Sequence, residues 1–256
     1  MAGDYSGTSN MRAGHVQGYF GGTFLSADGD NADATVFGAA GRLNVPISEY
    51  WNIQGDAAID ALSQDGTLSV LSGTVHAFWR DPTTYAVGAF ASLEDFNSSE
   101  SDVDIYAWLV GLEGQRYMGD YTLYGQIWGG QLTDGSDDVN EFGVRGVVRY
   151  FGHENWRLDG EVSLNTLSAD GDTITNFGLG TQAMYQFPGS AFAVFGRYDF
   201  NHLSGSGDSL DIHTVAVGFR GTFQSGGSGH TSMTLKEEDR QGATMESPHA
   251  NSITGL

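Results

Sequence analysis

The chain of 256 residues contains no cysteine, four prolines, and 11 lysines and arginines in total. Without cysteine there is no disulfide, no thiolate nucleophile and no cysteine-ligated zinc. The 32 acidic residues give a formal net charge of −21. So few basic residues argue against a nucleic-acid partner, because phosphate binding needs lysine and arginine patches. No run of 18 apolar residues occurs, which excludes a transmembrane helix.

The N-terminal residues Met1–Asp4 lack the basic start and apolar stretch of a signal peptide. We therefore expect either a cytosolic chain or the mature form of an exported one. Glycine is plentiful, with 38 residues, and aromatic residues make up 12% of the chain. This composition favours many strands joined by tight turns.

Residues 15–223 alternate between apolar and polar side chains nearly throughout, with no sustained helical period. In the segment 156–167, for example, Trp156, Leu158 and Val162 share one face and Arg157 and Asp159 the other. Most segments hold 10 to 14 residues, and ten or eleven tilted residues cover an apolar band of about 25 Å, the thickness of a membrane. We count twelve such segments, at 14–25, 34–46, 51–61, 68–80, 85–93, 104–117, 121–132, 140–151, 156–167, 174–187, 190–200 and 211–223.

The connections between these segments also alternate in length. Short turns, such as 81–84 and 118–120, alternate along the chain with longer acidic stretches, such as 26–33 and 94–103. An even number of strands with short turns at one end and longer loops at the other is typical of an outer-membrane barrel. We therefore predict an all-β fold, a single antiparallel up-and-down transmembrane barrel of about twelve strands.

Aromatic residues lie at both rims of the predicted apolar face. Trp and Tyr prefer the level of the lipid headgroups, so two girdles are expected of a membrane barrel and not of a buried core. The girdle residues that we single out are Trp51, Trp79, Tyr85, Trp108, Tyr150, Trp156 and Tyr185.

The last predicted strand, His213–Phe223, ends on an aromatic residue, with Phe219 and Phe223 on one face. It resembles the closing strand of the porin-type outer-membrane β-barrels of Gram-negative bacteria, among them those of alphaproteobacteria. The resemblance covers about residues 15–223. It implies that Phe219 and Phe223 form an assembly signal, that the barrel-assembly machinery inserts the protein, and that its partners are outer-membrane lipid and lipopolysaccharide. It also implies that the short turns and both termini are periplasmic and that the acidic loops are extracellular.

The chain departs from this family by continuing for 33 residues beyond Phe223. We predict three parts: an N-terminal periplasmic segment at 1–13, the barrel at 14–223 and a flexible C-terminal tail at 224–256. The tail is rich in glycine and serine at its start and has no period. A plug of the lumen is the alternative interpretation of the tail.

The polar face carries charges of both signs. Two interpretations stay open: pairs of arginine and carboxylate that cross-link and fill the barrel, or an arginine constriction that steers small anions. Twelve strands fall between filled and open barrels, so the strand count does not decide. The predicted lumen charges are Arg42, Asp56, Asp60, Arg80, Glu113, Glu141, Arg145, Arg149, Arg157, Asp159, Glu161, Arg197, Asp199 and Arg220.

The acidic loops have two interpretations, a solvated negative surface or carboxylates that loosely bind Ca²⁺ or Mg²⁺ and so bridge to lipopolysaccharide. Asp28 and Asp30 resemble the start of an EF-hand loop, but its twelfth position is Ala39 and not glutamate. We reject an EF-hand and predict neither a defined metal site nor any other cofactor.

No catalytic constellation stands out. His76 is predicted to face the lumen as a polar filler, and the other histidines have no nucleophile at a useful spacing. We therefore expect no enzyme. The predicted function is a narrow porin-like channel in the bacterial outer membrane for passive diffusion of small hydrophilic solutes. The alternative is a non-conducting structural barrel whose loops or tail bind lipopolysaccharide or a protein. Self-association into a homo-oligomer stays open.

Overall fold

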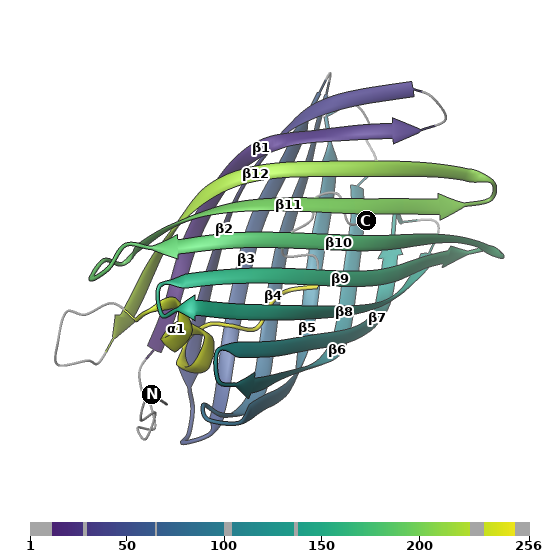
Figure 1. The fold of residues 1–256 in the computed structure, drawn as a ribbon. Helices are drawn as coiled ribbons and strands as arrows, with labels where there is room; N and C mark the ends of the chain where they lie inside the picture. The colour runs from purple at the N-terminus through teal and green to yellow at the C-terminus, as the bar shows by residue number, and fades with distance from the viewer. Residues whose placement is uncertain are drawn as a thin grey trace.

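The computed structural model describes residues 12–27, 30–64, 66–99, 104–135, 138–225 and 233–248. Twelve antiparallel strands form a closed barrel in which each strand pairs with its neighbours in the chain and β1 pairs with β12 (Figure 1). The predicted fold is confirmed. The strands are β1 (Arg12–Ala27), β2 (Asp30–Pro46), β3 (Trp51–Ser63), β4 (Thr67–Asp81), β5 (Tyr85–Ser98), β6 (Asp104–Met118), β7 (Tyr121–Thr133), β8 (Asp138–His153), β9 (Trp156–Ala169), β10 (Asp172–Gln186), β11 (Phe192–Gly205) and β12 (Asp208–Ser225).

The alternation of the sequence explains which way the side chains face. In β9, Leu158 and Val162 are 47% and 48% exposed, whereas Arg157 and Asp159 between and beside them are buried. Successive residues of a strand point to opposite faces. The apolar face is therefore the outer surface of the barrel and the polar face lines the lumen, which is the arrangement of a barrel that faces lipid. Closure leaves no strand edge unpaired.

We call the end of the barrel that carries the connections 47–50, 82–84, 119–120, 154–155 and 187–191 the turn end, and the opposite one the loop end. The strands hold 13 to 18 residues and run further into the acidic segments than the sequence predicted. Two loop-end connections are two-residue hairpins with positive φ, at Asp170–Gly171 and Ser206–Gly207. This is the backbone geometry of the tight turns that match strand twist. With the tilt of about 40° that is typical of membrane barrels, a strand of 14 residues rises about 35 Å along the barrel axis. The strands therefore extend beyond the apolar band of about 25 Å.

Close packing inside the barrel depends on glycine at particular positions. A Cβ on Gly143 of β8 would lie 2.2 Å from the indole of Trp128 on β7. The Trp128 Nε1–H in turn donates to Glu141, 2.7 Å away. Any larger residue at position 143 would therefore push the indole out of its site. The glycine-rich composition reflects ring-over-glycine packing here.

Past β12 the chain re-enters the barrel. A short helix, α1 (Leu235–Gln241), lies inside the turn end, and the chain after it extends further along the lumen (Figure 1). The helix begins with a capping box, because the Thr234 side chain accepts from the Glu237 N–H and the Glu237 carboxylate accepts from the Thr234 N–H. Within the described residues, no helix has the length and apolar character needed to cross a membrane.

Candidate functional site in the barrel lumen

Most of residues 233–248, here called the luminal segment, are buried inside the barrel, and Glu237 is the exposed exception. The prediction of a flexible tail is wrong for these residues, and the alternative of a lumen plug describes them. Residues 226–232 and 249–256 of the predicted tail, and 1–11 of the predicted N-terminal segment, lie outside the described residues. The prediction failed because the tail has no period of its own. Its order comes from complementary groups on the barrel wall.

Two apolar side chains anchor the luminal segment. Leu235 is 1% exposed and packs in a cluster with Phe151, Met184, Ala193 and Phe195 of the wall. Burial of a leucine or methionine side chain contributes about 1.5–3 kcal/mol, so the anchors compensate part of the entropy lost on ordering the chain.

The second anchor, Met245, has no exposed surface and packs against Phe78, Ala86, Tyr124 and Val147. The two anchors lie ten residues apart in the sequence and contact different strands. The segment is therefore fixed at both of its parts, the helix and the extended chain.

Arg149 of β8 forms the centre of the charge network. Its Nη1 lies 2.8 Å from Asp239 and its Nη2 lies 2.7 Å from Glu246, so one guanidinium binds two carboxylates of the segment. The Thr122 hydroxyl donates to the other oxygen of Asp239. Charge-assisted hydrogen bonds of this kind are about twice as strong as neutral ones.

Glu246 also contacts two further arginines of the wall. Arg145 binds it through Nη2, and the Arg157 guanidinium lies 3.6 Å away. Burial alone would raise the pKa of Glu246, but Arg145 and Arg149 beside it hold that pKa well below its ordinary value. Glu246 is therefore a carboxylate in the bound segment at every pH near neutrality.

Near the turn end, Glu238 of α1 accepts from His15 of β1 at 2.6 Å and lies 3.6 Å from Arg220 of β12. Arg220 also donates to Gln17 at 2.8 Å. This contact ties the segment to both strands at the closure of the barrel.

The backbone of the segment is bound by side chains of the wall. Arg80 donates to the Gln241 and Gly242 carbonyls at 2.7 and 2.8 Å. The Gln54 amide pairs with Met245 on both sides, donating to its carbonyl and accepting from its N–H. An extended chain without strand neighbours needs such partners, because buried backbone groups without hydrogen bonds are costly.

All fourteen predicted lumen charges lie on the inner face of the barrel, and each has an identified partner. Pairs within the wall hold most of the acids. Arg42 contacts Asp56 on the neighbouring strand at 3.3 Å, and Arg157 binds Asp159 of its own strand at 2.6 Å. The remaining pairs and hydrogen bonds of this set join Arg145 and Arg197 to Glu161, Arg197 to Asp199, Asp60 to Tyr19, Glu113 to His76 and Tyr124, and Glu141 to Trp128.

Three of these arginines differ from the rest. Among the described residues, the ion pairs of Arg149 and Arg220 are made only with carboxylates of the luminal segment, and Arg80 donates to two carbonyls of that segment and to Asn52. At the turn end, carboxylates of the segment therefore neutralise Arg149 and Arg220, and its carbonyls bind Arg80.

Sequence reasoning missed the carboxylates that the arginines bind, namely Glu238, Asp239 and Glu246. One signal was available, since Thr234-Leu-Lys-Glu237 is a capping box directly before two acids. Glu94 was also missed, because the predicted loop 94–103 begins with it. The structure places Glu94 within β5 with 3% exposure.

His76 is fully buried, with Nδ1 2.9 Å from Glu113 and Nε2 3.5 Å from Asp56. These two acids flank the ring, and Thr74 beside it pairs with Ser92 and not with the ring. The arrangement fits the predicted polar filler.

The predicted girdle residues all lie on the outer face. Trp51, Tyr85, Trp108, Tyr150 and Trp156 are exposed, and Trp79 and Tyr185 are half-buried by ring contacts with their neighbours.

Tyr117 of β6, by contrast, points inward, and the Arg240 guanidinium of α1 lies 4.3 Å from its ring centre. Phe219 and Phe223, the residues of the predicted assembly signal, are 64% and 48% exposed on the outer face.

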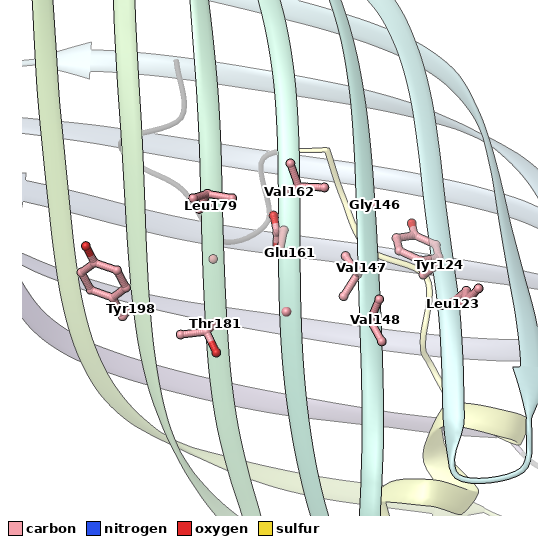
Figure 2. A pocket seen from close by; sticks show the side chains of 12 residues that line it. Leu123, Tyr124, Gly146, Val147, Val148, Glu161, Val162, Leu179, Thr181 and Tyr198 are labelled. Atoms are coloured by element: carbon pink, nitrogen blue, oxygen red, sulfur yellow. The ribbon is translucent and has the colours of Figure 1, made fainter.

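The outer face also has a shallow apolar groove over β7 to β11. Gly146, Gly160 and Thr181 line it, together with the exposed side chains of Leu123 and Tyr198 (Figure 2). Its lining is almost entirely apolar, as expected where the barrel faces lipid.

Within the described ranges, no group of three or more histidine, aspartate or glutamate side chains could hold a metal ion. Asp28 of the rejected EF-hand lies outside those ranges. Loose binding of Ca²⁺ or Mg²⁺ by the acidic loops stays a prediction.

No protein-family model matches this chain, and no curated protein sequence matches it. Solved structures do. An outer membrane channel from Pseudomonas putida F1 has a TM-score of 0.58 and 12% identity, over 87% of this chain and 99% of that one. The translocator domain of the autotransporter NalP from Neisseria meningitidis has a TM-score of 0.51 and 12% identity, over 84% and 89% of the two chains.

This is the fold of the outer-membrane β-barrels. With its apolar outer face and aromatic girdle, the barrel is placed in the bacterial outer membrane. At such low identity the likeness establishes the fold alone. The evidence for the function of the barrel therefore comes from the groups in its lumen. The alphaproteobacterial origin stays a prediction.

Proposed function

We propose that this outer-membrane barrel is a narrow channel for passive diffusion of small hydrophilic solutes, and that its own C-terminal segment closes it. Discrimination among solutes then comes from the charges of the lumen, with no chemical step and no cofactor. In the closed state of this proposal the luminal segment lies inside the barrel.

The observation that carries this proposal is the luminal segment itself. A helix and an extended chain fit inside the barrel and are bound mainly through polar wall groups such as Arg80, Gln54 and Gln115. A lumen that holds a polypeptide and is lined in this way leaves a water-compatible space at the turn end when the segment departs. A barrel filled by its wall alone would have no room for the segment.

The alternative is a structural barrel in which the segment is a permanent part of the core. The apolar contacts of Leu235 and Met245 favour it, because they resemble ordinary core packing. Under this alternative the acidic loops would bind lipopolysaccharide or a protein, and the barrel would not conduct.

Single-channel recording separates the two. A specific protease site is inserted between Ser225 and Met233, the full chain is folded, and the connection is cut afterwards so that the segment can be washed out. We expect small or rare conductance steps before the cut and larger, frequent steps after it. The matched control is the chain without the inserted site, treated with the same protease, and insertion is verified by heat-modifiable migration in a gel.

A barrel that is inserted and cut, has lost its segment and stays silent would overturn the channel proposal. Equal conductance before and after removal would keep the channel but overturn its closure by the segment.

A further inference from the structure

We propose that Arg145, Arg149 and Arg157, together with the Thr122 hydroxyl, form a binding site for small dicarboxylates, which the luminal segment occupies with its own carboxylates. The inference rests on the proposed opening of the lumen. It goes beyond that function by naming the chemical class of the solute and the groups that select it.

The geometry of the two bound carboxylates carries this proposal. Asp239 and Glu246 are seven positions apart in the sequence, yet their oxygens bind neighbouring nitrogens of the single Arg149 guanidinium. The carboxylates therefore lie as close together as the two ends of a short dicarboxylic acid. A planar guanidinium presents its two Nη donors in a fixed geometry, and here each of them binds one of the two carboxylates.

The charges of the site also favour an anion, because its three arginines face two carboxylates of the wall. Arg157 has a carboxylate of the wall, Asp159, at 2.6 Å, and Arg145 has Glu161 at 2.7 Å. Arg149 has no ion pair with a wall carboxylate among the described residues. When the segment leaves, the site loses the carboxylates of Asp239 and Glu246, together with Arg240, whose Nε lies 3.7 Å from Asp239. A dicarboxylate supplies two carboxylates again.

Neutral donors around the site extend the recognition. Thr122 donates to Asp239, Gln126 donates to the Glu246 carbonyl, and Gln115 donates to Thr244. Once the segment departs, these donors face the lumen and can bind carboxylate, hydroxyl or carbonyl oxygens of a solute. The burial of Arg149, at 1% exposure, keeps its interactions strong.

Segment and solute then compete for the same groups. A dicarboxylate stabilises the open barrel, and the carboxylates of the segment pair with the arginines when no such solute is present. Binding of a ligand to one state only shifts the equilibrium toward that state.

Titration calorimetry of the folded barrel in detergent tests the inference without depending on conductance. Succinate is added to the uncut protein and to the protein whose segment has been cut and washed out. Acetate provides the matched single carboxylate, and sulfate provides a compact dianion. We expect succinate to bind the cut barrel, to bind the uncut one far more weakly, and to bind more tightly than acetate or sulfate.

Two substitutions that each remove one positive charge sharpen this test. Loss of a charge-assisted pair in Arg149→Gln should weaken succinate binding by about tenfold or more. Arg197→Gln, whose ion pairs are with Glu161 and Asp199 of the wall, should weaken it much less. If Arg149→Gln does not fold, Arg149→Lys replaces it, because it keeps the charge but loses the bidentate fork and should still weaken succinate.

Equal affinity for succinate and sulfate would overturn the inference, because general attraction of anions would then suffice. So would equal losses in the two glutamine variants, or equal binding before and after the cut. A cut barrel that conducts but does not select succinate would leave the channel standing without this site. One that binds succinate but never conducts would keep the site and overturn the channel.

Discussion

In the half of the lumen toward the loop end, Asp60 is bound by the Tyr19 hydroxyl of the wall, whereas in the turn half Arg149 is bound by Asp239 and Glu246 of the luminal segment. The loop half also contains an apolar cluster made entirely of wall residues, Val36, Val70, Phe96, Ala107 and Leu132. The loop half is therefore complete in itself. The turn half is complete only when the segment is bound, which makes it the part of the barrel that can change state.

The largest expected effect comes from removing the centre of the turn half. Arg149→Ala in the full chain leaves two buried carboxylates without their main partner, and breaking a buried pair in this way costs about 3–5 kcal/mol. The free energy of unfolding in detergent, followed by heat-modifiable migration, measures this loss. In the barrel without its segment the same substitution should cost much less. An equal loss in both forms would show that Arg149 stabilises the wall and not the segment.

Next in size is the loss of an apolar anchor. Leu235→Ala should weaken the segment by about 2–5 kcal/mol and expose it to a protease, since Leu235 packs against Phe151 and Met184. Phe96→Ala in the loop half is the matched control. It should destabilise the barrel by a similar amount without exposing the segment. Limited proteolysis at residues 233–248 distinguishes the two, and equal cleavage of both variants would contradict the comparison.

A smaller effect is expected from pH. Because the pKa of Glu246 is held below its ordinary value in the bound segment, its contribution is fully present above the pKa of the detached segment, about 4.5, and is lost as the pH falls through the depressed value. Arg145, Arg149, Arg157 and Arg42 are the charges that act on it. Acid should therefore favour the open channel.

Conductance recorded from pH 7 down to pH 3 checks this expectation. Glu246→Gln is the control, because an amide cannot titrate, and should flatten the part of the pH response that Glu246 produces. An unchanged response in that variant would assign the titration to other acids.

The smallest effect is expected at the rim. Lys236 of α1 contacts Asp120 of a turn at 2.8 Å, and the Asp120 side chain is largely exposed. Exposed pairs of this kind contribute little and are screened by salt. Lys236→Ala should leave the conductance and the protease resistance of the segment almost unchanged. A large opening effect would show that the rim, and not Arg149, holds the segment.

The strands and the direction of their side chains could be predicted from the sequence because both follow from local alternation. The segment 156–167 already separates Trp156 and Leu158 from Arg157 and Asp159, and β9 keeps that separation. The error in the predicted end of β5 is also local. The prediction ended β5 before Glu94, because an acidic stretch begins there, whereas the strand continues to Ser98.

The sequence by itself determined the barrel, its lipid-facing side and the set of charges in its lumen, since a period of two residues assigns each side chain to one face of a strand. Only the tertiary structure decided the partners of those charges. Asp239 and Glu246 lie 90 and 97 positions from Arg149 along the chain, and no pattern near them announces the contact. Closing the barrel brings arginines from separate strands around one space, and these arginines bind the segment that fills it.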